Sequence, residues 1–369
     1  MILHYVLKII RYEFEIDLLN FLCLIIVENG DDYDYGIIFL FRYENINMFP
    51  YLIQCYFNQW ISNISYQEKN HFAIAFDILN KNKDCKRGKK YWFESIQTYK
   101  DFSELLPCVT YEMIADDVQR MMQWEKNILL SWLPKYFAQT AWTTTGNAKY
   151  LPVTSDALQK NHFLCWKTTL ANYMRNNPSS PLFAWKSLIL WGGFSQNTFW
   201  WSIPIWYISA ILQKESWFIW NCFRTPSWAI SFHHDRERKI QKILEICLSQ
   251  NVTSMWWVTS WALVLLEKIK ECTWKEVLYD IWPNFSLYLS WWVNFEPYRH
   301  YFAKFFPDQK TKFYQVYNAS EWFFASQWTN ESTDMILHTN HWVFFECIEM
   351  ESYFESTKKI VPLDDIIIW

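Results

Sequence analysis

Glycine is scarce in this sequence. The chain of 369 residues contains 6 glycines, whereas a chain of this length ordinarily carries roughly 26. Tryptophan departs in the opposite direction, with 25 residues in a class that is normally among the rarest. Only glycine readily adopts positive φ or lets the backbone approach a ligand closely. A true shortage of glycine would therefore exclude most tight turns and phosphate-binding loops.

The positions of many tryptophans are ones at which glycine is usual. Trp142 lies in the run Ala-Trp-Thr-Thr-Thr-Gly, Trp191 directly precedes Gly192-Gly193, and Trp228 follows Ser227. An indole cannot serve in a tight polar turn of this kind. These contexts predict that most tryptophans here stand for glycine, through a UGA codon that the source organism reads as glycine. The alternative interpretation is a protein that is truly rich in tryptophan.

Several other features are missing and restrict the function. A net charge of −4 argues against nucleic-acid binding driven by bulk electrostatics. A hydrophobic fraction of 51% excludes a disordered chain. None of the nine cysteines forms a C-x-x-C pair, which argues against a structural zinc site and a disulfide framework. The cysteine pattern predicts a reducing, cytoplasmic location.

The one long uncharged run depends on the identity of its tryptophans. Ser187 to Gln213 contains no charged residue and, taken literally, is long enough for a membrane span. With glycine in place of tryptophan, the run becomes a polar, glycine-rich loop and strand. Near the N-terminus, only Leu18 to Val27 is free of charges, which is too short to cross a bilayer. The sequence therefore predicts no membrane association.

The order of expected elements indicates an α/β fold. Residues 1–65 are predicted to be an uncertain helical lead-in or a wrongly assigned gene start, and residues 66–369 one large, truncated domain. Helices are expected at 72–82, 102–106, 111–123, 156–176, 235–250 and 261–270, with Asp101 and Thr110 as N-caps. Strands are expected at 135–139, 150–154, 187–190, 277–281, 313–317, 335–338 and 343–348. Alternating strands and helices predict layered sheets and helices.

The strongest local motif is the run Thr140 to Lys149, Thr-Ala-Trp-Thr-Thr-Thr-Gly-Asn-Ala-Lys. With glycine at position 142 it becomes a loop whose backbone N–H groups and hydroxyls can surround phosphate oxygens, while Lys149 adds positive charge. It is not the Walker pattern, so a P-loop NTPase is not implied. A polar hairpin turn is the structural alternative.

Further motifs follow in a recognisable order. They are Trp92-Phe93 after a basic run, Ser260-Trp261, Trp282-Pro283-Asn284, the Trp291 to Arg299 segment, and Tyr-Asn-Ala-Ser-Glu-Trp at 317–322. With the loop at 140–146, residues 66–369 resemble the auxin-responsive, Gretchen Hagen-type acyl-acid amido synthetases and their bacterial relatives, which are adenylate-forming enzymes. By this resemblance Trp142, Trp291, Trp292 and Trp322 fall where the family has glycine. Trp261 and Trp282 are expected to be genuine.

The resemblance implies both a fold and a reaction. The fold would be the large N-terminal domain of an adenylate-forming enzyme, with mixed sheets layered with helices and the small C-terminal domain missing. The reaction would use ATP and Mg²⁺ to activate a carboxylic acid as an acyl-adenylate. An amine or amino acid would then take the acyl group and form an amide.

The resemblance also assigns roles to residues. Phosphate-binding positions would be Thr140, Trp142, Thr143, Thr144, Thr145 and Gly146, assisted by Lys149. Tyr317 would lie against adenine, Ser320 near the α-phosphate, and Glu321 would help to hold Mg²⁺, so that Glu321 and Lys149 are the expected catalytic residues. The acyl pocket would be bordered by Ser260, Trp261, Asn294, Phe295, Tyr298 and Arg299.

Two departures weaken the resemblance. Position 141 is alanine where the family usually has serine, which removes a hydroxyl. No ribose-binding aspartate motif follows Trp369, so an incomplete or inactive fragment is expected. The alternative function is a tryptophan-rich membrane-associated or carbohydrate-binding protein without catalysis. It would use Trp200, Trp201, Trp256, Trp257, Trp291 and Trp292 as stacking groups.

Overall fold

The computed structural model describes residues 24–28, 35–39, 57, 71–140, 148–190, 203–216, 220, 223–231, 236–308, 310–354 and 359–366. The chain divides into two compact units, Met1–Ile53 and Gln54–Trp369. In the first unit, β1 (Leu24–Glu28) pairs antiparallel with β2 (Tyr35–Phe39). The expected helical lead-in is therefore wrong for these residues, whose aliphatic, partly β-branched side chains favour strands.

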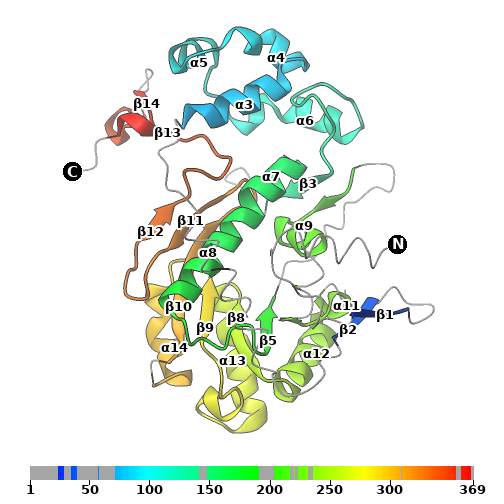
Figure 1. Cartoon of the computed structure of the whole chain (residues 1–369), viewed down its shortest axis with the longest axis vertical. Coiled ribbons are helices and arrows are strands. Elements are labelled where there is room, and N and C mark those ends of the chain that lie inside the picture. The colour runs from blue at the N-terminus through cyan, green and yellow to red at the C-terminus, as the bar shows by residue number, and fades with distance from the viewer. Residues whose placement is uncertain are drawn as a thin grey trace. The chain divides into compact units, whose positions relative to one another are not determined.

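A seven-stranded sheet forms the centre of the second unit (Figure 1). Its order is β12-β11-β10-β9-β8-β5-β7. The strands are β5 (Lys186–Ile189), β7 (Arg224–Thr225), β8 (Val252–Trp256), β9 (Leu287–Ser290), β10 (Lys312–Asn318), β11 (Phe323–Gln327) and β12 (Met335–Leu337). The strands from β7 to β10 are parallel, whereas β11 and β12 are added antiparallel at one edge.

Helices cover both faces of this sheet. In register across β8, β9 and β10, Met255, Tyr288 and Phe313 contribute to one hydrophobic cluster. That cluster also takes residues from α12 (Arg236–Ser249), α13 (Thr259–Thr273) and α14 (Arg299–Phe305). The next positions on β8 and β10 pack against α8 (Phe163–Asn176), where Trp166 stacks on Trp256 and Tyr173 meets Tyr314 edge-on. Successive side chains of a strand alternate between faces, which produces these two layers.

A second, three-stranded sheet has the order β4-β3-β6. It consists of β3 (Tyr136–Gln139), β4 (Tyr150–Val153) and β6 (Ile205–Trp206). Its two faces are covered by α6 (Ala115–Met122) and α9 (Ile208–Glu215) through separate hydrophobic clusters. The helix α9 corrects the expectation that the whole stretch from 187 to 213 is loop and strand.

Short helices precede this sheet: α3 (Phe72–Asn82), α4 (Lys86–Lys90) and α5 (Tyr99–Leu105). The α5 helix contacts the hairpin of β13 (Glu346–Ile348) and β14 (Ile360–Pro362), where the Tyr99 hydroxyl donates to Glu346 Oε1 at 2.9 Å. The α5 helix begins earlier than expected. Its N-cap is Thr98, and Asp101 is the third helical residue, which closes a capping box.

Other boundaries confirm or correct the sequence-based expectations. The expected helix 72–82 is confirmed at both ends. The expected helix 111–123 is instead a 3₁₀ turn followed by α6, and Thr110 makes no side-chain capping bond. The expected strand 277–281 is wrong, because Leu278–Asp280 forms a 3₁₀ turn. Among the residues that the structure describes, no helix is long and apolar enough to span a bilayer.

Candidate functional site

Three of the predicted groups lie at one edge of the seven-stranded sheet. The parallel strands β8, β9 and β10 end at Trp256, Ser290 and Asn318. Their registers match, with Trp256 opposite Leu289 and Leu289 opposite Tyr314. The segments that follow these strands therefore start from a common edge, where open α/β sheets bind ligands.

The loop after β10 presents the residues predicted for adenine and Mg²⁺. Tyr317 is 57% exposed, and its ring centroid lies 5.0 Å from that of Phe324. The Ala319 N–H donates to the Trp322 carbonyl at 3.0 Å, which closes the turn around Ser320 and Glu321. Ser320 is half-buried and Glu321 is exposed. The loop thus offers an aromatic face and a carboxylate to solvent.

Buried polar residues, which the sequence patterns did not predict, support this loop. Asn161 accepts from the Phe323 N–H at 2.8 Å and donates to the Phe323 carbonyl at 3.1 Å. Burial lowers the pKa of the neighbouring His162 to about 4, against a smaller opposing effect of the Asn318 side chain. Both residues belong to the π-helical turn Leu158–His162 that leads into α8. Wider turns of this kind are frequent at functional sites.

The segment after β9 contains four residues predicted for the acyl pocket. Asn294 is exposed, and its Oδ1 accepts from the Glu296 N–H at 3.0 Å. Phe295 is fully buried and stacks on Phe313 at 4.9 Å. Arg299 forms an ion pair with Glu296 at 2.6 Å, and its guanidinium lies 5.2 Å from the Phe295 ring. Tyr298 is half-buried against the core cluster.

The turn after β8 places Ser260 and Trp261 in the first turn of α13, and both are exposed. The Trp261 ring stacks on Trp257 at 6.4 Å. In contrast, Trp256 and Trp291 are buried around Trp166. These two indoles belong to the core and are not surface groups that could stack on a carbohydrate.

The predicted phosphate loop connects β3 to β4. The Thr140 N–H donates to the Lys149 carbonyl at 2.9 Å, and the Lys149 N–H donates to Thr140 Oγ1 at 3.2 Å, so this pair frames the loop. Lys149 Nζ lies 3.5 Å from Glu112. Residues 141–147, including Trp142, Thr143, Thr144, Thr145 and Gly146, lie outside the described residues.

Tryptophan occupies most of the positive-φ positions. In the part of the chain that the structure describes, the non-glycine residues with positive φ are Trp92 (49°), Trp124 (69°), Asn127 (59°), Trp274 (58°), Trp292 (76°) and Trp342 (63°). A bulky residue in this region is a conformational outlier, whereas glycine adopts it freely. Of the tryptophans predicted to stand for glycine, Trp292 has this conformation.

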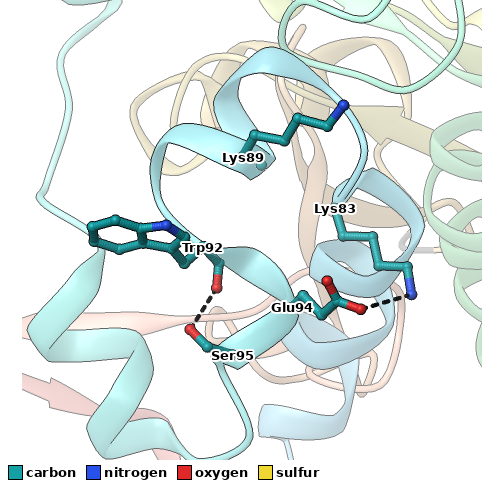
Figure 2. Close-up of a pocket in the computed structure, with 6 residues that line it drawn as sticks. Lys83, Lys89, Trp92, Glu94 and Ser95 are labelled. Atoms are coloured by element: carbon teal, nitrogen blue, oxygen red, sulfur yellow. Dashed lines mark hydrogen bonds and ion pairs between the residues drawn. The ribbon is translucent and has the colours of Figure 1, made fainter.

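A cavity of about 470 Å³ lies away from these groups. It is lined by Lys83, Gly88, Lys89, Trp92, Glu94 and Ser95 (Figure 2). Lys83 and Glu94 point toward one another and form an ion pair at 3.8 Å, whereas the Trp92 indole points away from them. None of the predicted site residues lines this cavity.

Comparisons with known proteins concern the fold and the family of the chain. Residues 67–198 match the GH3 family N-terminal domain. The fold is similar to the AtGH3.15 acyl acid amido synthetase in complex with 2,4-DB, with a TM-score of 0.70 and 14% identity, covering 89% of this chain and 65% of that one. A GH3.15 acyl acid amido synthetase gives a TM-score of 0.69 at 14% identity, covering 85% of this chain and 64% of that one.

The chain thus spans less than two thirds of the length of these solved relatives. A search of curated protein sequences finds no match. The expected mixed α/β fold class is confirmed, since the chain shares the fold of these acyl acid amido synthetases. The family match over residues 67–198 and the similarity of fold both agree with the resemblance drawn from the sequence motifs.

Proposed function

We propose that the chain carries the acid-activating part of an acyl-acid amido synthetase. The observation that supports this most is the convergence of three predicted groups at the carboxyl edge of β8, β9 and β10. A carboxylate oxygen of the acid would attack the α-phosphorus of ATP, and pyrophosphate would leave with the bonding electrons. An amine, such as that of an amino acid, would then attack the acyl carbon, lose a proton and release AMP.

The residues at this edge fit ATP and Mg²⁺ in their chemistry. The exposed Tyr317 ring offers a face for adenine. Mg²⁺ prefers oxygen ligands and usually combines one or two carboxylates with phosphate oxygens and water. The exposed Glu321 carboxylate suits that role. Thr140 and Lys149 would support the phosphates from the ends of the β3–β4 loop, and bound Mg²⁺ would neutralise phosphate charge.

The acyl pocket would lie between the segments that follow β8 and β9. Ser260 and Trp261 border it from the start of α13. Arg299 is already paired with Glu296 through two hydrogen bonds of 3.0 and 2.6 Å. An acid that used Arg299 as its anchor would have to displace Glu296, so this pair favours a role in shaping the pocket over one in binding the carboxylate.

We also propose that the tryptophans at positive φ, and Trp142 in the phosphate loop, are glycine in the protein that the source organism makes. Trp92, Trp124, Trp274, Trp292 and Trp342 support this, because an indole gains nothing from a left-handed backbone. A cytoplasmic location is proposed on the free cysteines of the described residues, which include the exposed Cys108 and Cys272.

Pyrophosphate exchange tests the function. Two preparations are compared. One has the tryptophan-containing sequence, and the other has glycine in place of the five positive-φ tryptophans and of Trp142, Trp291 and Trp322. Each preparation receives ATP, Mg²⁺, labelled pyrophosphate and a panel of carboxylic acids. We expect acid-dependent appearance of label in ATP with the glycine-restored chain, and amide formation once amino acids are added.

A matched pair of variants makes this experiment specific. Glu321→Gln should lower exchange about 100-fold, the usual scale for removing one group that stabilises transition-state charge. Glu331→Gln, which changes another exposed glutamate, should leave it unchanged. Exchange that needs no acid, or that is equal in both variants, would refute the assignment.

A further inference from the structure

A cluster of one cysteine and two histidines lies outside the proposed ATP and acyl sites. Cys165 belongs to α8, and His338 and His341 follow β12. Their potential ligand atoms all lie within 4.8 Å of one another. The three residues are buried, with exposed fractions of 0%, 5% and 8%. Buried polar groups need partners, so their concentration at one point requires an explanation.

The hydrogen bonds fix the tautomer of His341. Thr168 Oγ1 lies 2.9 Å from the Leu164 carbonyl, to which its single proton is donated. The same oxygen lies 2.9 Å from His341 Nε2 and must therefore accept the Nε2–H. The Nδ1 atom then carries a bare lone pair. It is buried and has no hydrogen-bond partner, so this lone pair is available to a cation.

His338 is oriented in a similar way. Its Nε2 lies 3.0 Å from the buried Ser326 hydroxyl, and its ring centroid lies 4.9 Å from that of His341. Metal-binding histidines usually bond through one ring nitrogen while the other is held by a hydrogen-bonding group. Thr168 and Ser326 would act as such supporting groups, and Nδ1 of His341 is a buried ring nitrogen without a hydrogen-bond partner.

The protonation states suit a metal ion. Both imidazole rings are buried, which favours their neutral, metal-binding form. The Cys165 thiol makes only long contacts, 3.6 Å to the Phe323 carbonyl and 3.7 Å from the Asn161 amide. Burial raises the pKa of that thiol, so the metal ion itself would have to displace the proton as the thiolate forms.

We propose that Cys165, His338 and His341 form a buried Zn²⁺ site. One sulfur and two imidazole nitrogens are a donor set that zinc prefers, whereas Mg²⁺ and Ca²⁺ require oxygens. Ligand atoms around tetrahedral zinc are about 3.3–3.8 Å apart at its usual bond lengths. The cluster would therefore contract by about 1 Å, and water would complete the fourth position.

The site would join α8 to the segment after β12. Asn161 already links these parts, because it donates to the His341 carbonyl at 2.8 Å and also holds Phe323. Zinc would therefore rigidify the support behind the Tyr317–Trp322 loop. This zinc site would be distinct from the Mg²⁺ site proposed for ATP, because its three ligands are buried.

Metal content and cobalt spectroscopy test the site in the full chain. The protein is stripped with a chelator, loaded with Zn²⁺, dialysed and analysed for metal. We expect about one zinc per chain, and with Co²⁺ alone a thiolate-to-cobalt charge-transfer band. Cys165→Ser and His341→Gln should reduce the zinc content at least tenfold. Cys272→Ser and His300→Asn, which change exposed residues of the same types, should retain it.

Two results would overturn the proposal. One is a zinc content below one tenth per chain in the unmodified protein. The other is equal content in Cys165→Ser, which would assign the metal to surface groups. Should the site variants fail to fold, the cobalt spectrum of the unmodified protein decides, since a missing thiolate band excludes Cys165 as a ligand.

Discussion

Replacing Trp274 by glycine should stabilise the protein. Trp274 ends α13 with φ 58° and ψ 20°, and its N–H donates to the Lys270 carbonyl at 2.8 Å. A left-handed conformation costs an L-residue about 1–2 kcal/mol. The indole is 90% exposed, so its burial returns almost nothing. Glycine removes this strain but adds about 0.5–1 kcal/mol of unfolded-state entropy, which leaves a net gain of about 0.75 kcal/mol at the midpoints of the two ranges.

Two further substitutions make the comparison decisive. Trp282 is fully buried, and its Nε1–H donates to the Cys247 carbonyl at 2.8 Å. Trp282→Gly should therefore cost at least about 3–5 kcal/mol through the cavity that it leaves. Trp261 lies in the first turn of the helix that Trp274 caps, and Trp261→Gly should cost about 0.5 kcal/mol in helix propensity. The effect of replacing tryptophan by glycine on stability thus changes sign with the backbone conformation of the residue.

Urea unfolding provides the measurement. The midpoint of Trp274→Gly should rise while the slope with urea stays constant, since the surface exposed on unfolding is nearly unchanged. A lower midpoint for Trp274→Gly than for the parent would refute the argument, because it would mean that the indole stabilises the helix end. The exposed Trp92 and Trp124 should respond in the same direction.

Three further predictions concern the support and the face of the site. Lowering the pH from 6.5 toward 4 should reduce the unfolding free energy by up to about 1.4 kcal/mol per pH unit for His162. The unfolded chain takes up a proton near pH 6.5, whereas folded His162 stays neutral down to about pH 4. Urea titrations at stepped pH check this, and His162→Asn should lower the slope by that one share only, because burial lowers the pKa of His338 and His341 as well. Asn161→Ala should lower the free energy of unfolding by about 1–3 kcal/mol, because it leaves the buried Phe323 N–H unpaired. Calorimetry measures this change, and an unchanged stability would contradict the prediction. Tyr317→Ala should weaken ATP binding about tenfold, the scale of one stacking contact, without lowering the melting temperature, as its ring is largely exposed.

Local sequence patterns predicted some elements well and missed others for a physical reason. The helix Phe72–Asn82 was predicted with both ends, because its apolar positions recur at helical spacing. The strands β8 and β9 were missed, although they are the centre of the sheet. Every residue of both strands is buried, so they lack the alternation of polar and apolar residues that marks a half-exposed strand.

The run Val277 to Ile281 shows the opposite error. A short apolar run fits a strand and a buried turn equally well. In the structure Leu278 enters the core, while the Tyr279 hydroxyl bonds Thr311 at 2.8 Å. The expected strand does not form, because in the described part of the chain no strand pairs with this segment. A local sequence pattern does not reveal whether a partner strand is present.

The candidate site divides along the same line. The motifs after β8, β9 and β10 could be singled out from the sequence because each is compact. The parallel sheet brings them to one edge, and the roles that the family resemblance gives them stay predictions. Asn161 could not be singled out, since its partner Phe323 lies 162 positions away. In the sequence, an asparagine on the apolar face of a helix only weakens the amphipathic pattern and does not indicate a function. It becomes a functional candidate only when the structure identifies the backbone that it satisfies. The cluster of Cys165, His338 and His341 could not be predicted for the same reason. Its cysteine and histidines lie far apart in the sequence and form no short metal-binding motif.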